Sequence, residues 1–149
     1  MAYSTTMDFA LERQHIDPYD DVKEFMVSNP PIFSLAPVLA SLNIFTEAGM
    51  ENLRAKSILL TGHLEFLVNH LMGNDIKIIT PNHPDERGAQ LSLYVEGKAE
   101  ALQRALNDEG VVCDSRGPHI LRLAPAPLYN TFEYNCRAVD ALKRIIRAT

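Results

Sequence analysis

The spacing of the apolar residues changes period near Gly73, and this change limits the folds open to the chain. Before Gly73, apolar residues recur at helical spacing, first over residues 35–48 and then again after Gly49. After Gly73 they alternate, which is the pattern of a strand with one buried face. We therefore expect helices that cover a small sheet. The apolar stripe of the second helical segment consists of Leu53, Leu60, Leu64, Leu67 and Leu71.

The second half of the chain alternates strand patterns with helical ones. Residues 75–80 and 89–95 alternate as strands do, whereas residues 98–110 form an amphipathic helical pattern that ends on a glycine. The segment "VVC" and residues 120–124 return to extended structure. The second half therefore supplies the strands of the sheet and at least one helix to cover it.

A final helix is predicted from its start signal. Asn130 is a good N-cap residue, and Glu133 follows it at the spacing of a capping box. The complete order is α-α-β-β-α-β-β-α. The predicted fold class is α/β, of the kind of a small α+β domain. Its sheet is expected to be small, mostly antiparallel or mixed, and covered by helices.

Size and charge exclude several kinds of partner. A chain of 149 residues with 46% hydrophobic residues can bury roughly two-thirds of its unfolded surface, enough for one core. A formal net charge of −5 without a run of Lys or Arg argues against nucleic acid or an anionic membrane as partner. No segment approaches the roughly 20 apolar residues of a membrane span, and no signal peptide is evident.

These features predict a cytoplasmic protein. Its two cysteines, Cys113 and Cys136, form no CxxC motif, which favours reduced thiols over a disulfide framework. Residues 1–24 are mixed and acidic, so we expect an extended, poorly ordered N-terminal segment, followed by one domain over residues 25–149.

Most of the reactive side chains have an ordinary structural interpretation. The histidines form no HExxH motif or zinc spacing, so no metal site is expected, and no P-loop, GxGxxG or GxSxG motif occurs. Cys113 is either a nucleophile or a buried structural cysteine, and the second is favoured because no His or Asn partner is close in sequence. The charged turn of Asp85, Glu86 and Arg87 is expected to be solvated.

Arg122 is the exception, because it stands in the apolar strand segment "ILRLA". Alternation directs its neighbours Leu121 and Leu123 into the core and the guanidinium to the opposite face. The planar fork of arginine binds both oxygens of a carboxylate, so one interpretation is a clamp for an acidic substrate. The alternatives are an arginine that extends to solvent, or a structural ion pair with a residue such as Asp114 or Glu133.

Five segments in order carry a family resemblance: "SNPPIFSLAPVLASLNIF", "EAGMENLRAKSILLTGHLEFL", "ITPNHPDERGAQLSL", "GVVCDSRGP" and "LRLAPAPLYNTFE". They resemble the C-terminal part of kynureninase, a hydrolase of the class V aminotransferase-like superfamily that depends on pyridoxal phosphate. The resemblance implies fold type I, in which homodimers carry the cofactor lysine on a large domain and a small C-terminal domain closes over the substrate.

The resemblance also implies roles for two residues. Arg122 falls on the arginine of the R-x-A-P-x-P-L-Y-N motif, which binds the α-carboxylate of the amino-acid substrate. Asn29 falls on the N-P-P-I motif, whose first residue contacts the cofactor region across the dimer interface. The implied reaction is hydrolysis of L-kynurenine or 3-hydroxykynurenine to alanine and anthranilate or 3-hydroxyanthranilate.

The resemblance does not extend to the cofactor lysine. In the family that lysine follows a tyrosine, and none of the five lysines in this chain does. We therefore expect no catalytic residue in this chain, no covalent bond to pyridoxal phosphate and no activity of the chain alone. Two hypotheses stay open: part of a kynureninase-like enzyme that needs the remaining portion, or a non-catalytic binding module that pairs with a large domain or a full-length relative.

Overall fold

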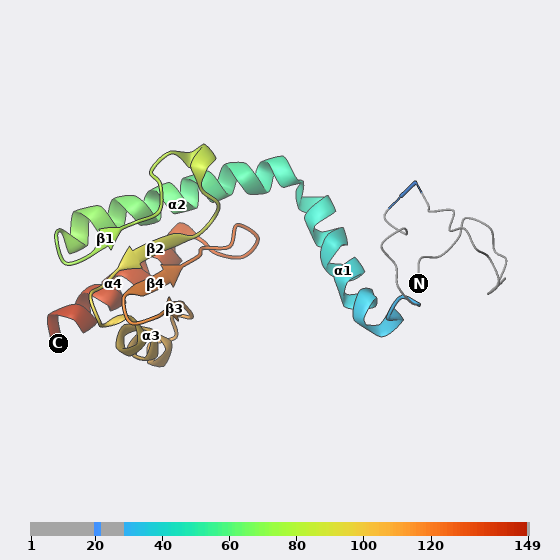
Figure 1. Cartoon of the computed structure of the whole chain (residues 1–149). Coiled ribbons are helices and arrows are strands. Elements are labelled where there is room, and N and C mark those ends of the chain that lie inside the picture. Colours follow the sequence, from blue (N-terminus) through green and yellow to red (C-terminus); the bar gives the residue numbers. More distant parts are fainter. Residues whose placement is uncertain (1–19, 22–28, 149) are drawn as a thin grey trace. The chain divides into compact units, whose positions relative to one another are not determined.

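The computed structural model of the chain describes residues 20–21 and 29–148 (Figure 1). The chain divides into two compact units, Met1–Glu47 and Ala48–Thr149. Apart from Asp20 and Asp21, the predicted N-terminal segment over residues 1–24 lies outside the described residues, as does the predicted domain boundary after residue 24.

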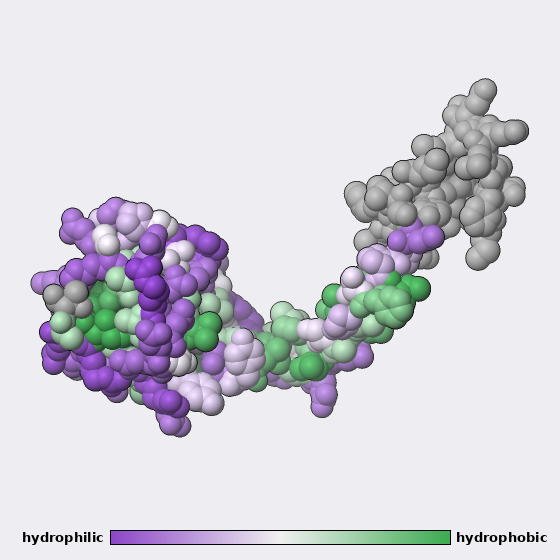
Figure 2. Space-filling model, turned by 90° about the horizontal axis from the view of Figure 1, so that it is seen from below, coloured by the Kyte–Doolittle hydropathy of each residue, from purple (hydrophilic) through white to green (hydrophobic). Residues whose placement is uncertain are grey.

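Helix α1 spans Ile32–Ala48 and confirms the helix predicted from residue 35 onward. It begins directly after Pro31, whose carbonyl oxygen accepts hydrogen bonds from the backbone N–H groups of Ser34 and Leu35. None of its residues is buried in the described part of the chain. Figure 2 shows hydrophobic residues gathered along this helix. Its exposed large apolar side chains are Ile32, Phe33, Leu35, Val38, Leu39, Leu42 and Ile44.

Helix α2 spans Met50–Met72 and buries the stripe expected of it. It follows Gly49, whose positive φ of 77° is a conformation that other residues adopt only with strain. Among the described residues no single helix is long and apolar enough to cross a membrane, although α1 and α2 pass that test together as a bent pair. The buried residues of α2 are Leu53, Ser57, Leu60, Thr61, Leu64, Val68 and Met72, with Leu67 and Leu71 partly buried.

The sheet contains four strands in the order β1-β2-β4-β3, and every neighbouring pair is antiparallel. The strands are β1 (Lys77–Ile78), β2 (Leu91–Tyr94), β3 (Asp114–Arg116) and β4 (Ile120–Leu123). The segment "VVC", predicted to be extended, precedes β3 and lies outside it.

One face of the sheet is covered and forms the core. Leu91 pairs with Leu123 and Leu93 with Leu121 across β2 and β4, and all four side chains are buried. They pack in one cluster with residues of α2, α3 (Ala99–Asp108) and α4 (Phe132–Ala148). A 3-10 helix over Pro84–Glu86 lies between β1 and β2. The predicted α+β class and element order are confirmed.

The predicted N-cap of the final helix is wrong by position. Helix α4 begins at Phe132, and the Asn130 side-chain oxygen instead accepts a hydrogen bond from the backbone N–H of Ala126 at 2.7 Å. Asparagine side chains readily form hydrogen bonds with nearby backbone groups in turns. Here the Asn130 side-chain oxygen bonds to the turn before the helix and therefore does not cap the helix.

Candidate carboxylate-binding site

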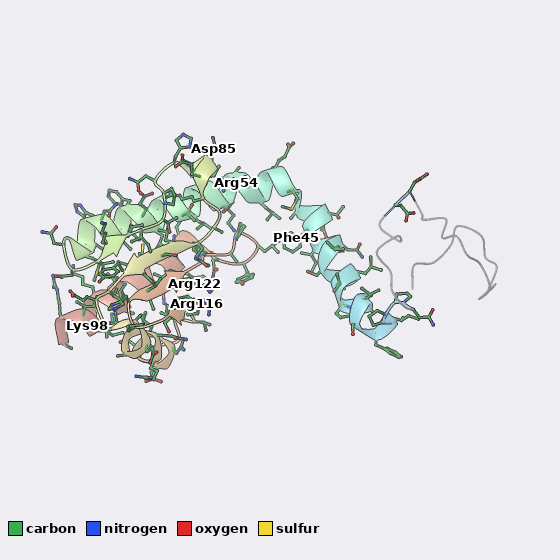
Figure 3. All side chains as sticks on the ribbon, in the orientation of Figure 1. Phe45, Arg54, Asp85, Lys98, Arg116 and Arg122 are labelled. Atoms are coloured by element: carbon green, nitrogen blue, oxygen red, sulfur yellow. The ribbon has the colours of Figure 1, made fainter. Side chains whose placement is uncertain are left out.

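Arg122 lies on the outer face of the sheet, as its place in the strand predicts. Along β4 the side chains of Leu121 and Leu123 are buried, whereas Ile120 and Arg122 are half-buried. The residues that pair with Arg122 are Ser92 on β2 and Asp114 on β3. Because directly paired residues share a face of the sheet, these side chains form a row across it. Figure 3 labels Arg122 and its neighbour Arg116 on the adjacent strands β4 and β3.

Asp114 binds the guanidinium of Arg122 through two parallel hydrogen bonds. Nε of Arg122 donates to Oδ1 of Asp114 at 2.5 Å, and Nη2 donates to Oδ2. Of the structural alternatives considered for Arg122, the ion pair with Asp114 is therefore present. Among the described residues no ion pair joins Arg122 to Glu133. The substrate-clamp interpretation stays a prediction.

A second arginine contacts the same carboxylate. Nη2 of Arg116 lies 3.3 Å from Oδ2 of Asp114. The hydrogen bond from Arg122, assisted by the positive charges of both arginines, holds the pKa of Asp114 below its usual value. The same hydrogen bond raises the pKa of Arg122. Two guanidinium groups against one carboxylate leave this cluster with one positive charge in excess.

The pair uses one edge of the guanidinium and leaves the other open. Asp114 occupies the edge formed by Nε and Nη2. Nη1 of Arg122, together with the second N–H of Nη2, forms the other forked edge, and it donates to no other residue in the part of the chain that the structure describes. With 26% of the Arg122 side chain exposed, a second carboxylate can approach this edge from solvent.

Cys113, beside this pair, lacks the properties of a nucleophile. Burial, and secondarily the negative charge of Asp114, raise the pKa of the Cys113 thiol to about 11. The thiol is therefore protonated at neutral pH, whereas the thiolate is the reactive form. The interpretation of Cys113 as a partly buried structural cysteine agrees with this environment.

The loop before β2 contains an ion pair that the sequence did not indicate. Nη2 of Arg87 lies 2.6 Å from Oε2 of Glu65 on α2, and its Nη1 donates to the carbonyl oxygen of Pro81 at 3.2 Å. The Arg87 side chain is only 4% exposed, so the expectation of a solvated turn is wrong for this residue. Asp85 and Glu86 are exposed, as expected. The error arises because the partner comes from a distant helix that a local pattern does not reveal.

Asn29 lies in a bend immediately before Pro30 and is exposed. It belongs to the first compact unit, whereas Arg122 belongs to the second. Its contact with the cofactor region stays a prediction from the resemblance.

Two solved structures share the fold of this chain. A NifS-like protein matches with a TM-score of 0.63 at 18% identity, over 85% of this chain and 37% of that protein. A C-DES mutant, described with glycine covalently linked to its PLP cofactor, matches with a TM-score of 0.62 at 18% identity, over 80% of this chain and 31% of that protein. The chain therefore has the fold of a part of each of these two larger proteins.

Sequence comparison assigns the family. Residues 53–142 match the model of the kynureninase C-terminal domain. Kynureninase from Myxococcus xanthus is 50% identical over 119 residues, which cover 80% of this chain and 28% of that enzyme. Human kynureninase is 46% identical over 130 residues, which cover 82% of this chain and 28% of that enzyme. The chain belongs to the kynureninase family, as the resemblance implied, and it spans less than a third of the length of these relatives.

Proposed function

We propose that this chain supplies the substrate-carboxylate-binding domain of a kynureninase that uses pyridoxal phosphate, with Arg122 as the ligand of the α-carboxylate. The observation that carries the proposal is the open Nη1–Nη2 edge of Arg122, which faces away from the core in the motif "LRLAPAPLYN". The excess positive charge of the cluster around Asp114 favours an anionic ligand there.

Membership in the kynureninase family supports a proposed substrate class. The substrate is L-kynurenine or its 3-hydroxy form, and hydrolysis of the Cβ–Cγ bond adds the hydroxyl of water to the acyl carbon and a proton to Cβ. The products are anthranilate or 3-hydroxyanthranilate and L-alanine, in the catabolism of tryptophan in the cytoplasm. Arg122 would fix the amino-acid end of the substrate, and such positioning contributes to catalysis without taking part in bond cleavage.

None of the lysines in this chain follows a tyrosine, so we expect the cofactor lysine elsewhere in the enzyme. Of the lysines that the structure describes, Lys77 and Lys98 are exposed and Lys56 and Lys143 are half-buried. In the described part of the chain, none of these four lysine side chains forms an ion pair. Pyridoxal phosphate would supply the electron sink for cleavage, and we assign its lysine to the portion of the enzyme that this chain does not span.

The exposed apolar side chains of helix α1 support a partner for this chain. Helix α1 exposes seven large apolar side chains, a surface that a chain acting alone would not keep. We assign this surface to contact with the large domain and to the homodimer of the family. The same observation favours the second candidate function, a non-catalytic module that pairs with a full-length relative.

The test is reconstitution. The chain is co-expressed with the N-terminal portion of Myxococcus xanthus kynureninase that precedes the matched region, and hydrolysis of kynurenine is measured with pyridoxal phosphate present. Arg122→Lys keeps the charge but loses the fork, and Arg122→Met loses both, so both variants should raise KM. Arg104→Met, at an exposed arginine of α3, is the matched control.

Two results decide between the candidates. A purified complex that hydrolyses kynurenine and loses this activity in both Arg122 variants, but not in Arg104→Met, supports the enzyme part. A stable complex without activity supports the binding module. An active complex in which both Arg122 variants keep the parental kcat/KM contradicts the role of Arg122.

A further inference from the structure

We propose that Asp114 is a positioning residue for Arg122, which holds the Nε–Nη2 edge of the guanidinium so that the Nη1–Nη2 edge is presented to the substrate carboxylate. This inference rests on the proposed function, because it takes Arg122 as the carboxylate ligand. It extends the proposed function by assigning a role to Asp114. It also gives the two edges of the guanidinium different partners, and it explains why an acidic side chain lies beside an anion site.

The first support is the geometry of the pair. Asp114 and Arg122 are direct cross-strand partners of β3 and β4, and the carboxylate engages the guanidinium through two parallel hydrogen bonds. A single hydrogen bond would leave the guanidinium free to rotate about the donor, whereas the bidentate pair fixes its plane. The second forked edge is thereby fixed in direction as well.

The second support is that Asp114 is itself held on both sides. Gln103 of α3 donates from Nε2 to the carbonyl oxygen of Cys113 at 3.2 Å. The hydroxyl of Ser115 donates to Oε1 of the same Gln103 at 2.6 Å. One side chain therefore anchors the residues before and after Asp114 to a packed helix, although β3 is an edge strand of the sheet.

The third support is the charge balance. Asp114 alone would neutralise Arg122 and repel a second carboxylate from it. Arg116, at 3.3 Å from Asp114, restores one positive charge to the cluster. The arrangement thus keeps the orienting effect of a carboxylate while offsetting its repulsion.

The decisive variant is Asp114→Asn in the reconstituted complex. Electrostatics alone predicts a lower KM for kynurenine, because a negative charge beside the anion site is removed. Loss of positioning predicts the opposite sign, because asparagine cannot accept both hydrogen bonds from the fork. We expect KM to rise by about tenfold or more with a smaller change in kcat. A KM that falls, or stays within about twofold, overturns the proposal.

Three measurements keep the result interpretable. Asp114→Glu keeps the charge and should recover part of the KM, whereas Asp108→Asn, at an exposed acid at the end of α3, should leave it unchanged. In the full 149-residue chain alone, NMR should show slower solvent exchange of the Arg122 Nε–H than of the Arg104 Nε–H, and Asp114→Asn should abolish the difference. If Asp114→Asn leaves that exchange unchanged, the positioning role is wrong.

The KM values of the Arg122→Met and Asp114→Asn variants together separate this proposal from the proposed function. If Arg122→Met leaves KM unchanged, Arg122 is not the carboxylate ligand and the proposed function fails. If Arg122→Met raises KM and Asp114→Asn does not, the proposed function stands and only the positioning role of Asp114 fails.

Discussion

Helices α1 and α2 follow one another in the chain and are both rich in apolar residues, yet only α2 buries any of them. In α2 the buried side chains recur on one stripe, so a single layer of sheet and helix covers them. In α1 the apolar side chains occur on opposite sides of the helix, for example at Leu35 and Ile44. A helix with apolar side chains on several sides buries them only when other elements pack against each of those sides.

The comparison separates a unit that has a core of its own from a helix that has none. The unit over Ala48–Thr149 satisfies its apolar faces internally through one core cluster. Helix α1, described by itself, buries none of its large apolar side chains. The internal core should therefore determine stability, while α1 should determine association.

The largest expected effect tests this division directly. Leu64→Ala in α2 removes a side chain that is fully buried in the core, and should lower the free energy of unfolding by about 3–5 kcal/mol. The matched change Leu39→Ala in α1 removes an exposed leucine and should change stability by less than about 0.5 kcal/mol. Urea denaturation of the two variants measures both values. A similar loss from each variant would show that α1 is packed as tightly as α2.

The buried ion pair should give the next largest effect. Glu65→Gln leaves the Arg87 guanidinium buried without its counter-charge, which should cost about 2–4 kcal/mol, less than a fully buried pair because Glu65 reaches solvent. Arg87→Met combined with Glu65→Gln should cost less than the sum of the single changes. A double-mutant cycle by denaturation measures this coupling, and additive losses would mean that the pair contributes nothing as a pair.

A smaller effect is expected between α2 and α4. The buried side-chain amide of Asn135 donates to the carbonyl oxygen of Leu60 at 2.9 Å. Asn135→Ala removes this bond and should lower the free energy of unfolding by about 1–2 kcal/mol. Asn107→Ala, at an exposed position of α3, is the control. Equal changes in melting temperature in both variants would show that the hydrogen bond between Asn135 and Leu60 makes no special contribution to stability.

The smallest effect is a pH dependence. The pKa of Cys113 is raised to about 11 in the folded chain, above the ordinary thiol value of 9.0. The unfolded chain therefore loses this proton first, so the contribution of Cys113 is fully present below pH 9 and is lost as the pH rises toward 11. Thermal unfolding between pH 8 and 11 should show a shallower decline in Cys113→Ala than in the parent chain. Parallel declines would show that Cys113 does not contribute.

The sequence by itself determined most of the helices and strands, and the face of the sheet that Arg122 occupies. Periodicity placed the helices and strands, and it placed Arg122 on the side of β4 opposite Leu121 and Leu123, because backbone geometry fixes these directions within a few residues. The kynureninase-like motifs indicated the family, because a motif is a local order of residue types that the sequence contains directly.

Only the tertiary structure decided which groups meet. Asp114 rather than Glu133 pairs with Arg122 because the register of β3 against β4 places them opposite each other. Arg87 is buried because α2 brings Glu65 to it. These pairings join segments that are separate in sequence, so they depend on packing and strand register, which no local pattern of residues specifies.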